Sequence, residues 1–295
     1  MENTWEYQGS EPIKIKHYLS QLGMGHRLFN DIKNGDGELM VDHRIVRPTT
    51  KILPHQTLTI KVTPELADPT VTASEKPLSV VYEDNNWLVI NKPSGLASIP
   101  GPTEADDTVL NRVKGYLIQQ KDENQRPHLI TRLDKYTSGL LLVAKHRVAS
   151  SMISQQVERH TMKKYYLALV QGNGLEKHGF IDEPIKRVAG QAARVIDPSG
   201  QSAKTEYWVQ KYNDQYSLVK LRLHSGRTHQ IRLHMSSLGH PLVGDHLYGG
   251  PLDKVDHQVL HASELSFTDP FTQQLKQFNA PLDQSDQQLL NDLGL

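Results

Sequence analysis

The chain has 295 residues, with 33 Lys plus Arg balanced by 33 Asp plus Glu, and it contains no cysteine. This length can bury a sizeable core with room for a small second domain, and the absence of cysteine excludes disulfides, thiolate catalysis and cysteine-ligated metal clusters. The chain has no run of about 18 apolar residues and begins with a polar, acidic stretch, so we expect no membrane span, no signal peptide and a cytoplasmic location.

The zero formal net charge hides an uneven distribution. Residues 12–64 carry 8 Lys plus Arg against 4 Asp plus Glu, and residues 159–240 carry 13 against 6. Residues 245–295 carry only 2 against 8. Zero net charge alone argues against a nucleic-acid partner, because phosphate contacts dominate such binding, but this segregation is compatible with a basic surface that faces RNA.

Residues 1–66 are predicted to form a small α/β module. Helical spacing of apolar residues and a later apolar–polar alternation predict helices over 13–22 and 26–33 and strands over 38–41 and 57–62. This order resembles the S4 RNA-binding module. The resemblance implies phosphate contacts from His26, Arg27, Lys33, Arg44 and Arg47. The alternative is a helical cap that does not touch RNA.

Residues 67–77 are polar and predicted to be a linker, and residues 78–295 are predicted to form one large domain. Many strands with few helices between them favour an α+β fold, in which helices flank a mixed, largely antiparallel sheet. The predicted strands are 78–82, 87–91, 140–144, 164–170, 180–185, 203–210, 216–223 and 259–265, and the predicted helices are 109–120, capped by Thr108, and 147–160.

The stretch 130–145 reads I-T-R-L-D-K-Y-T-S-G-L-L-L-V-A-K, and its apolar run is typical of a strand buried on both faces. The polar turn over 137–139 allows a tight backbone path that aims Asp134 into a cleft. A carboxylate at the edge of a core must be paired or functional. The simplest alternative is a loop salt bridge between Asp134 and Arg132.

A second informative stretch, residues 221–249, contains a predicted helix that starts at Thr228. Ile231, Met235 and Leu238 form its buried stripe, so Arg232 is placed beside the core. A guanidinium in that position needs a carboxylate partner, and Asp134 is the candidate. The alternative is a surface ion pair within the helix.

Five histidines in the same region invite a metal hypothesis: His224, His229, His234, His240 and His246. Residues five apart on a helix are rotated by about 140°, so His229 and His234 do not share a face. No H-E-x-x-H pattern occurs. We therefore predict no metal site.

The motif R-L-D-x-x-T-S-G-L-L-L-V-A-K resembles the active-site signature of the RluA-type pseudouridine synthase family. Three further stretches resemble the other family motifs, in the family's order: V-I-N-K-P-S-G-L, K-x-Y-x-A-L-V-x-G and S-G-R-T-H-Q-I-R-L-H-M. The resemblance extends over about residues 78–282. Thr131, in place of the usual His, and Tyr136 depart from the family pattern and put substrate preference in question.

The resemblance implies the pseudouridine synthase fold and an enzyme that isomerises specific uridines in structured RNA, either rRNA or tRNA, without a cofactor. It makes Asp134 the nucleophile, acting either on C1′ or on the C2′ proton, Arg232 its ion-pair partner and Tyr166 the aromatic that stacks on the target base. Arg132 would occupy the space of the flipped nucleotide. The other substrate contacts it implies are Thr131, Ile231, Asn91, Lys92, Arg227 and Lys164, and the loop 98–107 is a candidate for specificity.

Two other classes of function remain open. The chain could be a catalytically silent RNA-binding or ribosome-assembly factor, although such a factor has no need of Asp134, Arg132, Tyr166 and Arg232 together. It could also be a metal-dependent hydrolase that uses the histidines. We expect a monomer with no nucleotide cofactor, because no interface motif and no P-loop is evident.

Overall fold

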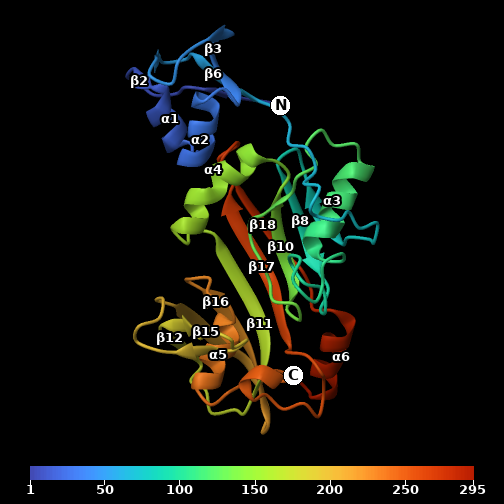
Figure 1. Cartoon of the computed structure of the whole chain (residues 1–295). Helices are drawn as coiled ribbons and strands as arrows, with labels where there is room; N and C mark the ends of the chain where they lie inside the picture. The colour runs from blue at the N-terminus through green and yellow to red at the C-terminus, as the bar shows by residue number, and fades with distance from the viewer.

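A ten-stranded sheet runs through the centre of the larger part of the molecule in the computed structural model, which describes residues 1–295 (Figure 1). The helices are α1 (Ile15–Gln21), α2 (His26–Lys33), α3 (Val109–Gln119), α4 (Arg147–Glu158), α5 (Gln230–Ser237) and α6 (Gln284–Asp292), with a 3₁₀ turn η1 (His246–Tyr248). No helix has the length and apolar character that crossing a membrane requires.

Eight strands follow one another across the central sheet, and two more attach to it. Their order is β12 (His178–Asp182), β15 (Lys204–Tyr212), β16 (Tyr216–Leu223), β11 (Lys163–Gln171), β17 (Leu260–Thr268), β10 (Ser138–Ala144), β8 (Trp87–Lys92) and β7 (Val80–Glu83), while β18 (Leu275–Asn279) pairs with β17 and β9 (His128–Leu129) with β10. Only β10 and β17 run parallel. The prediction of an α+β fold with a mixed, largely antiparallel sheet is therefore confirmed.

The predicted buried strand is β10, in which every residue is buried. At its start, Gly139 has a φ of 105° and lies against the backbone of Ala262 in β17, so a side chain there would clash with that strand. Glycine thus permits the close parallel pairing of β10 and β17. This pairing places the turn that precedes β10, and Asp134 with it, at the centre of the sheet.

The N-terminal module has its own sheet, in the order β1 (Glu2–Glu6), β6 (Thr57–Val62), β3 (Gly37–Val41) and β4 (Arg44–Ile45), plus the short pair β2 (Ile13–Lys14) and β5 (Lys51–Ile52). Both predicted helices are present, whereas β1 was not predicted. Its apolar core also takes in Val148 and Met152 of α4, and the Gly25 amide donates to Ser151 Oγ. The module therefore rests on α4, as Figure 1 also shows.

The five cations expected to contact phosphate in this module are all exposed, and none forms an ion pair: His26, Arg27, Lys33, Arg44 and Arg47. Their contact with RNA stays a prediction.

Residues 67–77 form no helix or strand, but they are tied to α3. Lys114 donates to the carbonyls of Asp68 and Val71, and Asn111 Nδ2 donates to Thr72 O at 2.7 Å. The segment expected to be a linker is thus packed along a helix of the large domain.

Several regions of the large domain differ from the sequence prediction, and strands β9 and β18 were not predicted. The single strand expected over 180–185 is divided between β12 and β13 (Ile185–Arg187), and β13 pairs with β14 (Arg194–Ile196) in a separate hairpin. Pro184 separates the two strands, which fits its inability to donate to a strand ladder. The C-terminal helix α6 was not predicted, because its apolar residues are few and spaced between Gln and Asp.

Candidate active site

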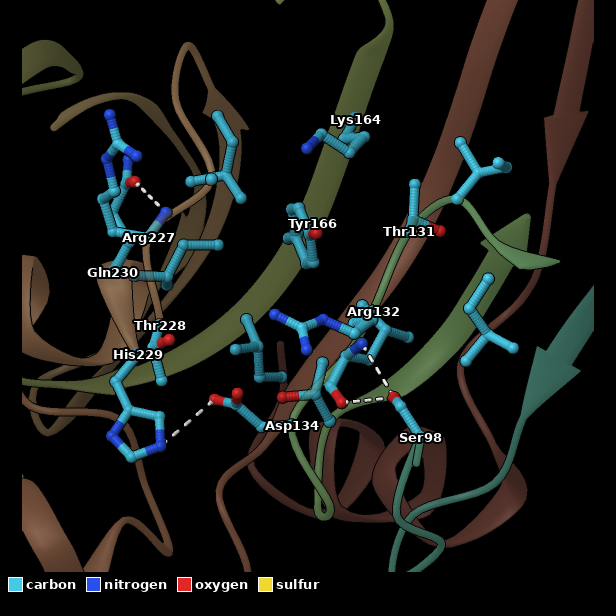
Figure 2. Close-up of a pocket in the computed structure, with 18 of the residues that line it drawn as sticks. Ser98, Thr131, Arg132, Asp134, Lys164, Tyr166, Arg227, Thr228, His229 and Gln230 are labelled. Carbon is cyan, nitrogen blue, oxygen red and sulfur yellow. Dashed lines mark hydrogen bonds and ion pairs between the residues drawn. The ribbon is translucent and has the colours of Figure 1, made fainter. Parts of the chain in front are cut away.

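A pocket of about 570 Å³ opens beside the turn that carries Asp134. Its walls come from the loop after β8, the turn before β10, the end of α4, strand β11 and the start of α5 (Figure 2). Eight of the ten predicted site residues line it: Thr131, Arg132, Asp134, Lys164, Tyr166, Arg227, Ile231 and Arg232. Segments about 100 residues apart in sequence thus meet in one cavity.

The Asp134 turn is held on both sides by hydrogen bonds. Ser98 Oγ donates to Leu133 O at 2.6 Å and accepts from the Leu133 amide at 3.1 Å, and the Thr137 amide donates to Asp134 O at 3.1 Å. The Asp134 side chain is 27% exposed and reaches into the pocket. The carboxylate therefore has a defined position while staying accessible.

Arg232 lies beside Asp134, as predicted, with Nη1 at 3.4 Å from Oδ2. Its closer partner is Asp245, whose oxygens accept from Nε at 2.7 Å and from Nη2 at 2.8 Å. Although burial acts to lower it, the pKa of Arg232 is raised by these hydrogen bonds and by the two carboxylates. Arg232 is a permanently charged group held between two acids.

Sequence reasoning missed Asp245. Its side chain is 0% exposed, and Oδ1 also accepts from the amides of Leu247 and Tyr248 at the start of η1. One signal was available, because Asp245 is the sole acidic residue between 215 and 252. A buried arginine in that stretch needed a carboxylate near it.

His229 also faces Asp134, which the sequence analysis did not foresee. It adopts a left-handed conformation with φ of 60° just before α5, and its Nε2 lies 3.9 Å from Asp134 Oδ2 while Nδ1 meets the Tyr248 hydroxyl at 3.0 Å. Burial lowers the pKa of His229. Arg232 and His229 thus both face Oδ2, and Oδ1 accepts no hydrogen bond from the protein.

The start of α5 differs from the prediction. Thr228 lies in a turn outside the helix, which begins at Gln230. The Gln230 side chain accepts from Ser225 Oγ and from the Arg227 amide, and it donates to Lys204 O. These hydrogen bonds set the path of residues 225–230 along the pocket wall.

Tyr166 lies on β11 with its ring in the pocket wall and only 6% exposed. Figure 2 shows it between Lys164 and Asp134. Burial, and then the negative charge of Asp134, raise the pKa of Tyr166 well above its ordinary value. The hydroxyl therefore stays protonated at neutral pH.

Asn91 and Lys92, predicted as substrate contacts, do not line the pocket. Lys92 is 1% exposed, and its ammonium donates to the carbonyls of Pro93, Leu96 and Lys135 at 2.7–3.0 Å. Burial lowers the pKa of Lys92 to about 7, against the opposing effect of Asp134. The structure gives Lys92 a structural role, in which it joins the loop after β8 to the Asp134 turn. Asn91 pairs with Leu140 inside the sheet.

Arg132 and Thr131 border the Asp134 turn in different ways. The Arg132 side chain is exposed and makes no ion pair, so the simple alternative of an Arg132–Asp134 salt bridge is absent. Thr131 Oγ1 accepts from the Leu142 amide at 2.9 Å, which anchors the turn to β10.

Three of the other histidines singled out in the sequence have partners elsewhere in the fold. His224 meets Glu206 at 2.8 Å, His234 meets Thr205 and Glu183 O, and His240 meets Gln171 O. No group of three or more His, Asp or Glu side chains in the structure is arranged to hold a metal ion.

Comparison with known proteins agrees with this fold and pocket. Residues 86–237 match the family described as RNA pseudouridylate synthase. The chain is 39% identical over 279 residues, 94% of its length and 98% of the relative's, to YjbO of Bacillus subtilis, an uncharacterized RNA pseudouridine synthase. It is 36% identical over 265 residues, 85% of its length and 81% of the relative's, to ribosomal large subunit pseudouridine synthase D of Yersinia pestis.

A solved structure is similar as well. The human RNA pseudouridylate synthase domain containing 1 superimposes with a TM-score of 0.58 at 28% identity, covering 71% of this chain and 85% of that one. The chain belongs to the RNA pseudouridine synthase family.

Proposed function

We propose that this protein isomerises specific uridines in structured RNA to pseudouridine, with Asp134 acting on the ribose. Ribosomal RNA is the proposed substrate class, because the Yersinia pestis relative is named for the large ribosomal subunit. The observation that carries the proposal is which groups surround the two oxygens of the Asp134 carboxylate. Its Oδ2 faces Arg232 and His229, and its Oδ1 is left without a protein partner inside a pocket.

The reaction breaks the bond between C1′ and N1 of uracil, forms a bond between C1′ and C5, and exchanges the C5 proton for a proton on N1. It is an isomerisation, so it needs no oxidant or reductant. Oδ1 of Asp134 is the atom that meets the ribose, and Arg232 and His229 hold the other oxygen. A carboxylate fixed in this way loses little freedom on reaching the transition state.

Other residues bind the target base and the surrounding RNA. Tyr166 offers the base a flat apolar face and a neutral hydroxyl. A base inside a duplex cannot reach this pocket, so the target must leave its stack, and the exposed guanidinium of Arg132 is suited to fill the vacated space. The N-terminal module adds phosphate contacts through its exposed cations.

The test is pseudouridine mapping across cellular RNA in three strains: wild type, a deletion, and the deletion carrying Asp134→Asn. We expect specific sites to disappear in the deletion and to stay absent with the variant. Purified Asp134→Asn should lose at least about 10³-fold in turnover, because its amide can neither attack C1′ nor take a proton. The same variant should bind RNA nearly as well as wild type.

Asp214→Asn is the matched control, since Asp214 is an exposed carboxylate without hydrogen bonds or ion pairs, and it should restore every site. Appreciable turnover by Asp134→Asn would contradict the proposal. If the deletion changed no site while the protein bound RNA, the silent RNA-binding factor would be the better description.

A further inference from the structure

The pocket has far more positive than negative charge. Asp134 is the sole carboxylate among its lining residues, whereas four cations line it: Arg132, Lys164, Arg227 and Arg232. Arg232 is neutralised by Asp134 and Asp245, and the other three form no ion pair. The protein therefore supplies no counter-charge for three cations that border its cavity.

Lys164 is the most unusual of the three. It lies on β11 two residues before Tyr166, so both side chains point to the same face of the sheet. Its ammonium has neither a hydrogen-bond nor an ion-pair partner, and burial alone lowers its pKa. The side chain is half-buried, and an ammonium that is partly shielded from water without a protein partner gains no stability there, so packing does not explain a lysine at this position.

The surroundings of Lys164 are basic and open to a ligand. A Cβ on Gly226 would lie 3.6 Å from Lys164 Nζ, so the backbone of the following residue, Arg227, passes close by. The Arg227 Nε donates to Ser202 O at 3.1 Å, which leaves both terminal nitrogens of its guanidinium without a protein partner. Burial, and then the charges of Lys164 and Arg227, lower the pKa of His160 at the same end of the pocket.

This basic end lies across the pocket from Asp134. Figure 2 shows Lys164 and Arg227 on one side of Tyr166 and Asp134 on the other. Two residues along a strand span about 6.6 Å, so Lys164 and Tyr166 are about one nucleotide apart. An RNA strand that places its target base at Tyr166 and the ribose at Asp134 also runs along the rest of the pocket wall, where a backbone phosphate on one side of the target meets Lys164 and Arg227.

We propose that Lys164, together with Arg227, forms a subsite for a phosphodiester that flanks the target uridine. This inference rests on the proposed function. A phosphodiester is anionic, and its oxygens accept hydrogen bonds. It can therefore pair with the Lys164 ammonium and with the two terminal nitrogens of Arg227, which have no partner in the protein. The subsite contacts a backbone phosphate on the 5′ or the 3′ side of the target nucleotide, and it thereby holds the strand so that the target ribose lies against Asp134.

The test is a double-mutant cycle between protein and RNA. A synthetic stem–loop that carries a mapped uridine is made with one neutral methylphosphonate, either 5′ or 3′ of that uridine. Pseudouridine formation and RNA affinity are measured for wild type, Lys164→Met and Lys164→Arg. Lys163→Met is the matched control, because Lys163 is the exposed neighbour on the opposite face of β11.

We expect Lys164→Met to lower kcat/KM about 10- to 100-fold and Lys164→Arg to recover most of that loss. One of the two methylphosphonates should lower the kcat/KM of wild type by a similar factor. It should hardly change the kcat/KM of Lys164→Met, because that variant already lacks the ammonium that pairs with the phosphate. The slope of log affinity against log salt should fall by about 0.7–0.9 in Lys164→Met, as expected for one lost phosphate contact. Lys163→Met should behave as wild type in turnover.

Stability supplies a second readout that separates binding from a structural role. Because the half-buried ammonium has no protein partner, Lys164→Met should raise Tm or leave it unchanged while activity falls. The inference would be overturned if Lys164→Met had a lower Tm and if each methylphosphonate lowered kcat/KM by the same factor in Lys164→Met as in wild type. That outcome would leave the proposed function intact. If wild type bound the RNA without converting it, the proposed function would fail, and the affinity cycle and salt slope would still decide the subsite.

Discussion

Asp245 sets the direction of Arg232 before any substrate arrives. It accepts two hydrogen bonds from the guanidinium, and the Tyr248 ring lies 5.1 Å from the guanidinium carbon. Asp134 receives only the remaining nitrogen, Nη1. This division keeps the arginine fixed, while the Asp134 carboxylate keeps one oxygen for chemistry.

Replacing Asp245 by Asn should therefore impair catalysis through Arg232. We expect Asp245→Asn to lower kcat about 10- to 100-fold with a smaller change in KM, because Arg232 is no longer held in place. The free energy of unfolding should fall by about 2–3 kcal/mol, since a buried ion pair loses one charge. Steady-state kinetics and urea unfolding measure both effects. Asp253→Asn, at an exposed acid, is the control, and an unchanged kcat in Asp245→Asn would refute this role.

The pair of Asp134 and Arg232 was the part of the proposed site easiest to predict. Asp134 follows from its place before a fully apolar strand, and Arg232 from its place beside a buried stripe. Asp245, His229 and Ser98 were missed, because their roles depend on contacts between segments that sequence periodicity does not relate.

At the scale of elements, the turn before β10 depends on the loop after β8. The Ser98 hydroxyl both donates to and accepts from the backbone of Leu133, next to Asp134, while it is buried from water. Lys92 joins the same two elements through Lys135 O. The position of Asp134, the proposed nucleophile, is thus fixed from a loop about 35 residues earlier.

Ser98→Ala should loosen this turn. Two buried backbone groups lose their partner, so we expect a loss of about 1–3 kcal/mol in stability. We also expect a several-fold decrease in kcat, because Asp134 no longer has a single position. Thermal unfolding and single-turnover rates test both. Ser94→Ala removes one exposed hydrogen bond to Tyr136 O in the same region and should have little effect; equal effects of the two variants would argue against a special role for Ser98.

At the scale of the whole molecule, an ion pair at the start of α6 joins two parts of the acidic C-terminal segment. His257 is 16% exposed and lies 3.5 Å from the buried carboxylate of Asp286 at the start of α6. The ion-pair contact with Asp286, followed by the hydrogen bond with Asp256, raises the pKa of His257 to about 9. The leucines of α6 then pack on the back of the sheet, against Val243 and Val259.

This ion pair predicts a pH-dependent stability. The folded-state pKa of about 9 exceeds the unfolded value of about 6.5, so the contribution is complete below about pH 6.5 and is lost as the pH rises through 9. At pH 6, His257→Gln should be less stable than wild type by about 2 kcal/mol, and at pH 10 the two should be nearly equal. Urea unfolding at both pH values is the measurement. His17→Gln, at an exposed position on α1, should show no such difference; a gap that stayed constant with pH would contradict the assignment.

The sequence by itself determined the elements whose signal is local. The apolar run of β10, the alternation in β6 and the Thr108 cap of α3 are properties of neighbouring residues, and each element lies where it was predicted to within about two residues. The main motifs identified the candidate nucleophile and its arginine for the same reason, because motif residues are adjacent in the chain.

Only the tertiary structure decided how the charges pair. It gave Arg232 a second carboxylate and aimed His229 at Asp134. In the folded structure Lys92 lies outside the pocket, and Lys164 lies in the pocket wall without a protein partner. These outcomes depend on which segments lie side by side in the sheet and on how far each side chain is from water. Both are set by packing across long sequence separations, which local patterns do not encode.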